Sequence, residues 1–275
     1  MKQEVNPKDT SRAQAFELWM KSPVPMVTLM KTFDVTRLRR ICRRTDMKFN
    51  MLLCWCIGRA ASRIDEFYLL PSQGKLYRYD RLCVNVIVNN ARGGINNCDI
   101  PYSDEVEQFE RDYESLTRRT AAECRDINDD EANIVGTSAV TVTQIDCIVN
   151  QYSGFFNNPF LAWGRYRKGW FKTTLPISFQ FHHVQMDGSQ STRFLEELQK
   201  TILSCQVSRK GVKFSACGSG DSRAYGDDTI INGDVLHLFQ FGLHRFCGHR
   251  SPGAVLYKGD AAVAEAFALE VMQEV

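Results

Sequence analysis

The side chains best suited to chemistry lie in the stretch PISFQFHHVQMDGSQSTRFLEELQ, residues 176–199. His182 and His183 end an apolar run, and an Asp-Gly pair follows just before a helix-like segment. Side chains alternate between the two faces of a strand, so His183 shares the apolar face of Phe179 and Phe181. An imidazole suits general-base chemistry because its unperturbed pKa lies near physiological pH.

Three hypotheses compete for this stretch. In the first, both histidines are polar residues at a strand end, and Asp187 forms a turn or caps a helix. In the second, His182, His183 and Asp187 bind a metal, although adjacent strand residues point in opposite directions. In the third, His183 is a general base and Asp187 turns away from it to brace the loop.

The elements that must position these residues follow from the pattern of apolar side chains. Helices are predicted at 11–20, 35–45, 50–64, 104–125 and 191–203. Strands are predicted at 23–35, at 75–90 as a pair or hairpin, at 133–150 and at 174–183. Helices and strands mix without strict alternation, which predicts an α+β fold: a two-layer sandwich of a mixed β-sheet with helices packed on one side.

Composition narrows the classes of partner. The 34 basic and 32 acidic residues leave a formal charge of +2, so neither a nucleic acid nor a membrane is expected as a partner. The first ten residues lack the apolar segment of a secretory signal. The ten cysteines form no C-x-x-C pair, and Cys54-Trp55-Cys56 has no second pair to complete a metal site. We therefore expect reduced thiols, a cytoplasmic protein and no metal.

The composition changes after about residue 207, where the chain becomes rich in glycine. This change predicts a catalytic domain over 1–207 and a C-terminal extension over 208–275. The role of the extension is left open between a disordered tail, an added segment and translation past a natural stop.

At FHHVQMDG, followed by TRFLEELQ, the sequence resembles the His-x-x-x-Asp-Gly signature of the coenzyme A-dependent acyltransferases. Dihydrolipoyl acyltransferases and peptide-synthetase condensation domains also contain this signature. The resemblance extends over roughly residues 10 to 205, through SRAQAFELW, FDVTRL, MKFNMLLCWCIGRAASRIDEF and PYSDEVEQF in order and at family spacing. PYSDEVEQF is most similar to the chloramphenicol acetyltransferase family.

The resemblance implies direct transfer of the acetyl group of acetyl-CoA to a hydroxyl, without an acyl-enzyme. His183 would be the general base, and Asp187 would be a structural brace paired with Arg12. His182 would be a neighbour with no chemical role. The family's homotrimer, with active sites at subunit interfaces, is the expected assembly, and chloramphenicol is the expected acceptor, which implies antibiotic resistance.

The sequence departs from the family where a serine hydroxyl should donate to the oxyanion. The matching segment is VTVTQID, in which Gln144 or Thr143 is the possible donor. Loss of one such donor typically costs ~10²–10³ in rate.

The acceptor pocket is the second departure. The resemblance assigns Trp19 and Ile95 to substrate binding, with Ile95 in a poorly aligned loop. Phe156 is a third substrate-binding candidate, beside Phe155 and Trp163, and core packing is the competing interpretation for all three.

Three functions are therefore weighed. The first is an acetyl-CoA-dependent O-acetyltransferase that acetylates chloramphenicol. The second is a related O-acyltransferase acting on another hydroxylated small molecule. The third is a non-catalytic relative that binds only CoA or another ligand.

Overall fold

A mixed β-sheet is the centre of the computed structural model, which describes residues 1–150, 152, 154 and 156–207. The strand order is β2 (Met26–Asp34), β10 (Thr173–His182), β8 (Phe160–Gly164), β7 (Asn133–Val140), β5 (Leu82–Asn89) and β6 (Ile95–Pro101). The two-residue β9 (Arg167–Lys168) also pairs with β10. Strand β7 runs parallel to β5 and β8, and the other pairs are antiparallel.

A smaller antiparallel sheet lies beside it. Its strands are β1 (Lys2–Val5), β4 (Lys75–Tyr79) and β3 (Leu69–Ser72), in that order. Leu69 and Leu76 from this sheet pack with Val184 in a small apolar cluster that also contacts Trp19. The small sheet thus supports the loop that follows β10.

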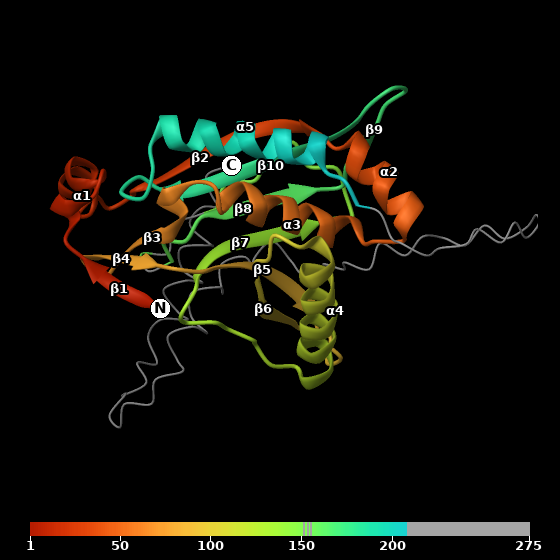
Figure 1. Ribbon diagram of the computed structural model, residues 1–275, viewed down its shortest axis with the longest axis horizontal. Helices are drawn as coiled ribbons and strands as arrows, with labels where there is room; N and C mark the ends of the chain where they lie inside the picture. The colour runs from red at the N-terminus through yellow and green to blue at the C-terminus, as the bar shows by residue number, and fades with distance from the viewer. Residues whose placement is uncertain (151, 153, 155, 208–275) are drawn as a thin grey trace, which may run out of the picture. The chain divides into compact units, whose positions relative to one another are not determined.

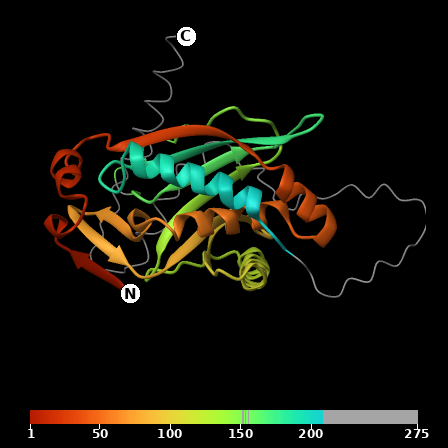
Figure 2. The ribbon, with the colours of Figure 1, turned by 45° about the horizontal axis from the view of Figure 1, so that its top comes forward.

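The helices are α1 (Ala13–Trp19), α2 (Thr36–Thr45), α3 (Phe49–Ala61), α4 (Val106–Glu123) and α5 (Gly188–Ser204), with two 3₁₀ turns, η1 (Pro7–Asp9) and η2 (Asp65–Tyr68). Helices α3 and α5 run across the front of the sheet in Figure 1, and Figure 2 shows them from above. Almost every side chain of α3 is buried, because α3 packs against strands β5 and β7 and against helices α2, α4 and α5. This arrangement confirms the predicted α+β sandwich.

The alternation along β10 separates the two faces of the sheet. Ile177, Phe179 and Phe181 are buried in the core cluster that includes α3 and α5. Ser178, Gln180 and His182 face the other way and are also buried.

A loop segment covers that second face. The amide of Ile148 donates to Ser178 Oγ at 2.8 Å, and Gln180 Nε2 donates to the carbonyl of Asn150 at 2.7 Å. The ring of Tyr152 meets His182 edge-on, with 6.5 Å between centroids. Ile148, Asn150 and Tyr152 therefore lie along β10 and cover its polar face.

Two sequence predictions about strands are wrong. The stretch 75–90 is not a hairpin, because β4 belongs to the small sheet and β5 to the large one. The strand predicted over 133–150 ends at Val140, and the residues after it form the covering loop. Alternation indicates that a segment is extended but does not say which strand is its partner.

The predicted boundary near Ser208 and the extension 208–275 lie outside the described residues. Among the helices that the structure describes, none has the length and apolar character required to cross a bilayer.

Candidate active site

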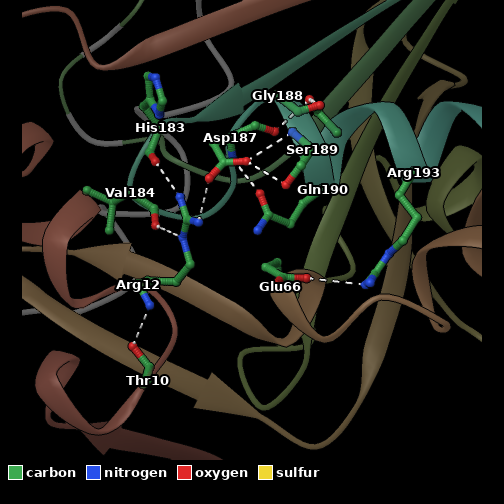
Figure 3. Close-up of polar contacts among 11 residues, drawn as sticks. Thr10, Arg12, Glu66, His183, Val184, Asp187, Gly188, Ser189, Gln190 and Arg193 are labelled. Atoms are coloured by element: carbon green, nitrogen blue, oxygen red, sulfur yellow. Dashed lines mark hydrogen bonds and ion pairs between the residues drawn. The ribbon is translucent and has the colours of Figure 1, made fainter.

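Arg12 holds the loop that joins β10 to α5. Its side chain is buried, with 3% of its surface exposed, and its Nε donates to the carbonyl of Val184 at 2.9 Å. One Nη donates to the carbonyl of His183 and the other to Asp187 Oδ2, both at 3.1 Å. Figure 3 shows all three contacts radiating from one guanidinium. The planar fork of arginine fits such a set of acceptors, which a lysine could not reproduce.

Asp187 has a second task at the start of α5. Its Oδ1 accepts from the amide and hydroxyl of Ser189, and Gln190 Oε1 accepts from the Asp187 amide, which completes a capping box. Burial alone would raise the pKa of this carboxyl, but hydrogen bonds from Arg12 and Ser189 outweigh it and lower the pKa. Asp187 thus remains a carboxylate that joins Arg12 to the helix.

His183 is the first residue after β10. Its amide donates to the carbonyl of Pro25 at 2.8 Å, which extends the pairing of β10 with β2 by one residue. Figure 3 shows the ring pointing away from Arg12 while the carbonyl faces the guanidinium. Hydrogen bonds with Arg12 and Pro25 thereby fix the backbone of His183 on both sides. We call the contacts of Arg12 with His183, Val184 and Asp187 the clamp, and the imidazole lies outside it.

The imidazole of His183 stacks on the indole of Trp19, the last residue of α1. Their centroids are 4.4 Å apart and the planes differ by 5°. Nδ1 of His183 is buried and has no hydrogen-bond partner within the part of the chain that the structure describes. Face-to-face stacking therefore positions the imidazole, and no hydrogen bond from the described residues fixes its tautomer.

His182 lies in a different environment. It is fully buried, and its Nδ1 accepts from the amide of Val184 at 3.1 Å. Burial, with a smaller contribution from the neighbouring His183, lowers the pKa of His182 to about 4. The two adjacent histidines thus differ in environment. His182 is neutral within the protein, and His183 is half-buried against an aromatic ring.

The candidate oxyanion donors lie elsewhere in the same chain. Thr143 and Gln144 are exposed in the loop after β7, where the carbonyl of Thr143 accepts from the amide of Arg165 at 2.6 Å. Arg165 follows β8 at the end that pairs with Ile177, six residues before His183. At ~3.3 Å per residue this places the loop about 20 Å along β10 from His183.

The candidate pocket residues divide in the same way. Trp19 lies against His183, whereas Ile95 begins the edge strand β6, four strands away from β10 or about 19 Å at the usual strand spacing. Phe156 is half-buried in the segment before β8. Trp163 is a core residue with 2% of its surface exposed, which rules out its pocket role, and Phe155 lies outside the described residues.

The eight described cysteines are free. Burial raises the pKa of Cys54 to about 12, whereas a hydrogen bond with Cys56 lowers the pKa of Cys205. Within the described residues, no group of three or more His, Cys, Asp or Glu side chains is placed to hold a metal ion.

The chloramphenicol acetyltransferase family model matches residues 3–199. The chain belongs to this family. Chloramphenicol acetyltransferase 3 of Escherichia coli is 22% identical over 199 residues, which cover 70% of this chain and 93% of that protein. The enzyme of Clostridium perfringens is 25% identical over 206 residues, covering 73% and 98%. A solved chloramphenicol acetyltransferase structure shares the fold, with a TM-score of 0.64 at 18% identity over 74% of this chain and all of that one.

Membership in the family identifies the protein as an acyltransferase, and the family uses acetyl-CoA as a substrate. The resemblance recognised from short motifs is thereby confirmed. Sequence inspection did not anticipate the contacts made by Trp19, Tyr152 and Pro25, because contacts between segments so far apart leave no local pattern.

Proposed function

We propose that this protein transfers the acetyl group of acetyl-CoA to a hydroxyl of a small molecule, with His183 as the general base and chloramphenicol as the acceptor. The observation that carries the proposal is the pairing of a clamped backbone with a stacked imidazole at the end of β10. Stacking on Trp19 positions the ring, and no hydrogen bond from the described residues occupies its nitrogen atoms. That arrangement suits a group that must accept and return a proton.

The reaction would proceed in two steps. With Nδ1 buried, Nε2 of His183 would accept the hydroxyl proton while the alcohol oxygen attacks the thioester carbonyl carbon. The tetrahedral intermediate would then expel the CoA sulfur, and the imidazolium would return its proton to that sulfur. General-base catalysis of this kind typically contributes ~10²–10⁴-fold.

Arg12 and Asp187 would act through His183, as positioning residues. Both contact the loop and not the ring, since Arg12 binds the carbonyls of His183 and Val184. A base displaced by about 1 Å can lose on the order of 10²-fold in rate. The clamp would therefore contribute to turnover by fixing where the imidazole lies.

The assembly we propose is a homotrimer with each active site shared between two chains. One chain supplies His183 with Trp19, but its own Ile95, Thr143 and Gln144 lie about 20 Å away from that ring. A neighbouring subunit would bring a second set of these residues to the imidazole. In that assembly Gln144 or Thr143 would donate to the oxyanion across the interface.

The proposal is tested by mixing acetyl-CoA and chloramphenicol with the full chain and measuring free thiol with a colorimetric reagent. Wild type should release thiol only when both substrates are present, and His183→Ala should lower the rate by at least 10³-fold. His182→Asn is the matched control, because an asparagine oxygen can still accept from the Val184 amide. It should turn over at a rate close to that of wild type at pH 7.5.

Two other results would redirect the proposal. Acetylation of another hydroxylated compound, with chloramphenicol inert, would keep the chemistry and change the acceptor. CoA binding measured by calorimetry, without transfer to any acceptor in a hydroxyl screen, would reject catalysis and favour a binding protein.

A further inference from the structure

The loop 169–172 joins β9 to β10 and presents two large aromatic side chains to solvent. The amide of Gly169 donates to the carbonyl of Lys172 at 2.8 Å, which closes the loop at Trp170 and Phe171. Trp170 is 99% exposed and Phe171 is 91% exposed. We call these two residues the aromatic tip. The hairpin that bears it projects beyond the sheet at the β9 label in Figure 1 and again in Figure 2.

Packing within the described part of the chain does not explain these residues. Aromatic side chains normally bury most of their surface, and these two are the most exposed large apolar residues in the part of the chain that the structure describes. A pair of adjacent, fully exposed aromatic rings marks a binding surface.

Cations surround the aromatic tip. Lys168 and Lys172 flank it, and residues 165–172 contain four basic and no acidic residues. Helix α2 contributes five arginines, of which Arg40, Arg43 and Arg44 are exposed. We call Lys168, Lys172, Arg40, Arg43 and Arg44 the basic collar. None of them forms an ion pair with another residue that the structure describes.

The hairpin and α2 form one surface. Tyr166 lies between the two elements: the Lys168 ammonium is 5.8 Å from its ring centroid and the Arg39 guanidinium is 6.0 Å from it. Arg39 also donates to Thr173 Oγ1 at 3.1 Å, directly after the tip. The positive charges of Lys172 and Arg40 both lower the pKa of the Asp34 carboxyl, so both side chains lie in the neighbourhood of that residue.

We propose that the aromatic tip and basic collar bind the surface of an anionic lipid membrane, with both rings inserted among the headgroups. The tip is convex, so a rigid protein partner would need a matching pocket for two adjacent rings, whereas a lipid interface deforms around them. Aromatic rings are favoured at the headgroup level of membranes, and cations beside them attract anionic lipids. Two such weak signals together give reversible binding.

The whole-chain charge of +2 conceals this surface, because acidic residues elsewhere cancel the collar. The expectation that no membrane takes part rested on that sum. A peripheral contact depends on local charge within about 8 Å, the Debye length at physiological salt.

The test uses vesicles of phosphatidylcholine with 40% phosphatidylglycerol, compared with phosphatidylcholine alone, and the full chain. The protein should float with the anionic vesicles at low salt and dissociate in 0.5 M NaCl. Its tryptophan emission should shift to the blue on binding, because Trp170 is exposed while Trp55 and Trp163 are already buried. Trp170→Phe should retain flotation and lose the spectral shift.

The variants separate the tip from the collar. Trp170→Ala with Phe171→Ala should lower the partition coefficient at least tenfold, and each of Lys168→Gln and Lys172→Gln should lower it about fivefold. Lys21→Gln and Val24→Ala are the matched controls, because Val24 is 67% exposed at the opposite end of β2. They should partition as wild type does.

Three outcomes would overturn the proposal. Absence of flotation with anionic vesicles would exclude a lipid partner. A change in oligomeric mass of the double alanine variant, measured by light scattering, would assign the tip to a contact between copies of this chain. Displacement of the protein from vesicles by free CoA would assign the collar to the phosphates of a soluble ligand.

Discussion

His183 and His182 are adjacent in sequence and serve different purposes because a strand sends them to different faces. The first stacks on Trp19, and the second lies on the buried face of β10 that Ile148, Asn150 and Tyr152 contact. Two adjacent histidines can therefore occupy different environments. The contacts of each ring show which histidine is available for chemistry.

Trp19 should control how His183 is oriented. Trp19→Ala removes a stack worth about 0.5–1.5 kcal/mol, so the imidazole would sample other rotamers and kcat should fall about tenfold. Trp19→Phe keeps a ring at the same place and should restore most of the loss. Steady-state kinetics on both variants, with circular dichroism to verify folding, checks this. Equal kcat for the alanine variant and wild type would refute the positioning role.

His182 should make stability depend on pH. Its folded pKa of about 4 lies below the ordinary 6.5, so between these values the unfolded chain binds a proton that the folded protein excludes. Stability should therefore be unaffected by His182 above pH 6.5 and should fall as the pH drops toward 4. The full effect is on the order of 3 kcal/mol, at about 1.4 kcal/mol per pKa unit.

His182→Asn cannot titrate and should lose this dependence. Urea unfolding of wild type and variant at pH 7.5, 6, 5 and 4.5 gives the comparison. The difference in unfolding free energy should shift in favour of the variant as the pH falls. A constant difference across the series would contradict the burial argument.

At the scale of elements, the sequence predicted where helices and strands lie better than it predicted which elements pack beside each other. Strand β10 and helix α5 were expected at 174–183 and 191–203 and are found at Thr173–His182 and Gly188–Ser204. Their apolar periodicity is local, so it can be recognised in a single segment. The short strands β1, β3, β8 and β9 were missed because two to five residues carry too little periodicity.

In the candidate site, too, local motifs could be recognised in the sequence, whereas contacts between distant segments could not. His183, Asp187 and Arg12 were identified because short motifs carry them, and the structure brings them together. The separation of Gln144 and Ile95 from His183 within one chain could not be foreseen, because it depends on strand order. Strand order is a long-range property that alternation along a strand does not specify.

The clamp of Arg12 and Asp187 joins α1, the loop after β10 and α5, so its loss should affect stability and turnover together. Asp187→Asn keeps a capping oxygen for Ser189 and loses the charge opposite Arg12. We expect unfolding free energy at pH 7 to fall by roughly 2 kcal/mol, the typical worth of a hydrogen bond to a charged group. kcat should fall with it, because the backbone of His183 is then less constrained.

The pH dependence tests the charge directly. Asp187 has a lowered pKa, so its contribution is present above the ordinary carboxyl value and is lost as the pH falls through the folded pKa. The difference between wild type and Asp187→Asn should therefore shrink as the pH falls below the ordinary carboxyl pKa. Arg193→Lys on α5, which keeps a positive charge opposite Glu66 of η2, is the control and should change stability by less than about 0.5 kcal/mol.

At the scale of the whole molecule, the distance between the two halves of the site is the decisive fact. If each active site combines His183 of one chain with the pocket of another, two inactive variants should complement each other. His183→Ala lacks the base, and Ile95→Arg places a guanidinium at the expected pocket. Co-expression at equal levels gives each interface an intact His183 in half of cases and an intact pocket in half. Roughly a quarter of wild-type activity should then return in a cyclic trimer.

The measurement is thiol release by purified mixed oligomers carrying two different affinity tags, with each variant purified alone as the baseline. Mixing the two variants after separate assembly is the control and should give no recovery until subunits exchange. Light scattering should report a mass of three chains. A mixed oligomer as inactive as its parents would mean that each chain builds its site alone, and His183 would then need an oxyanion donor that lies closer than Gln144.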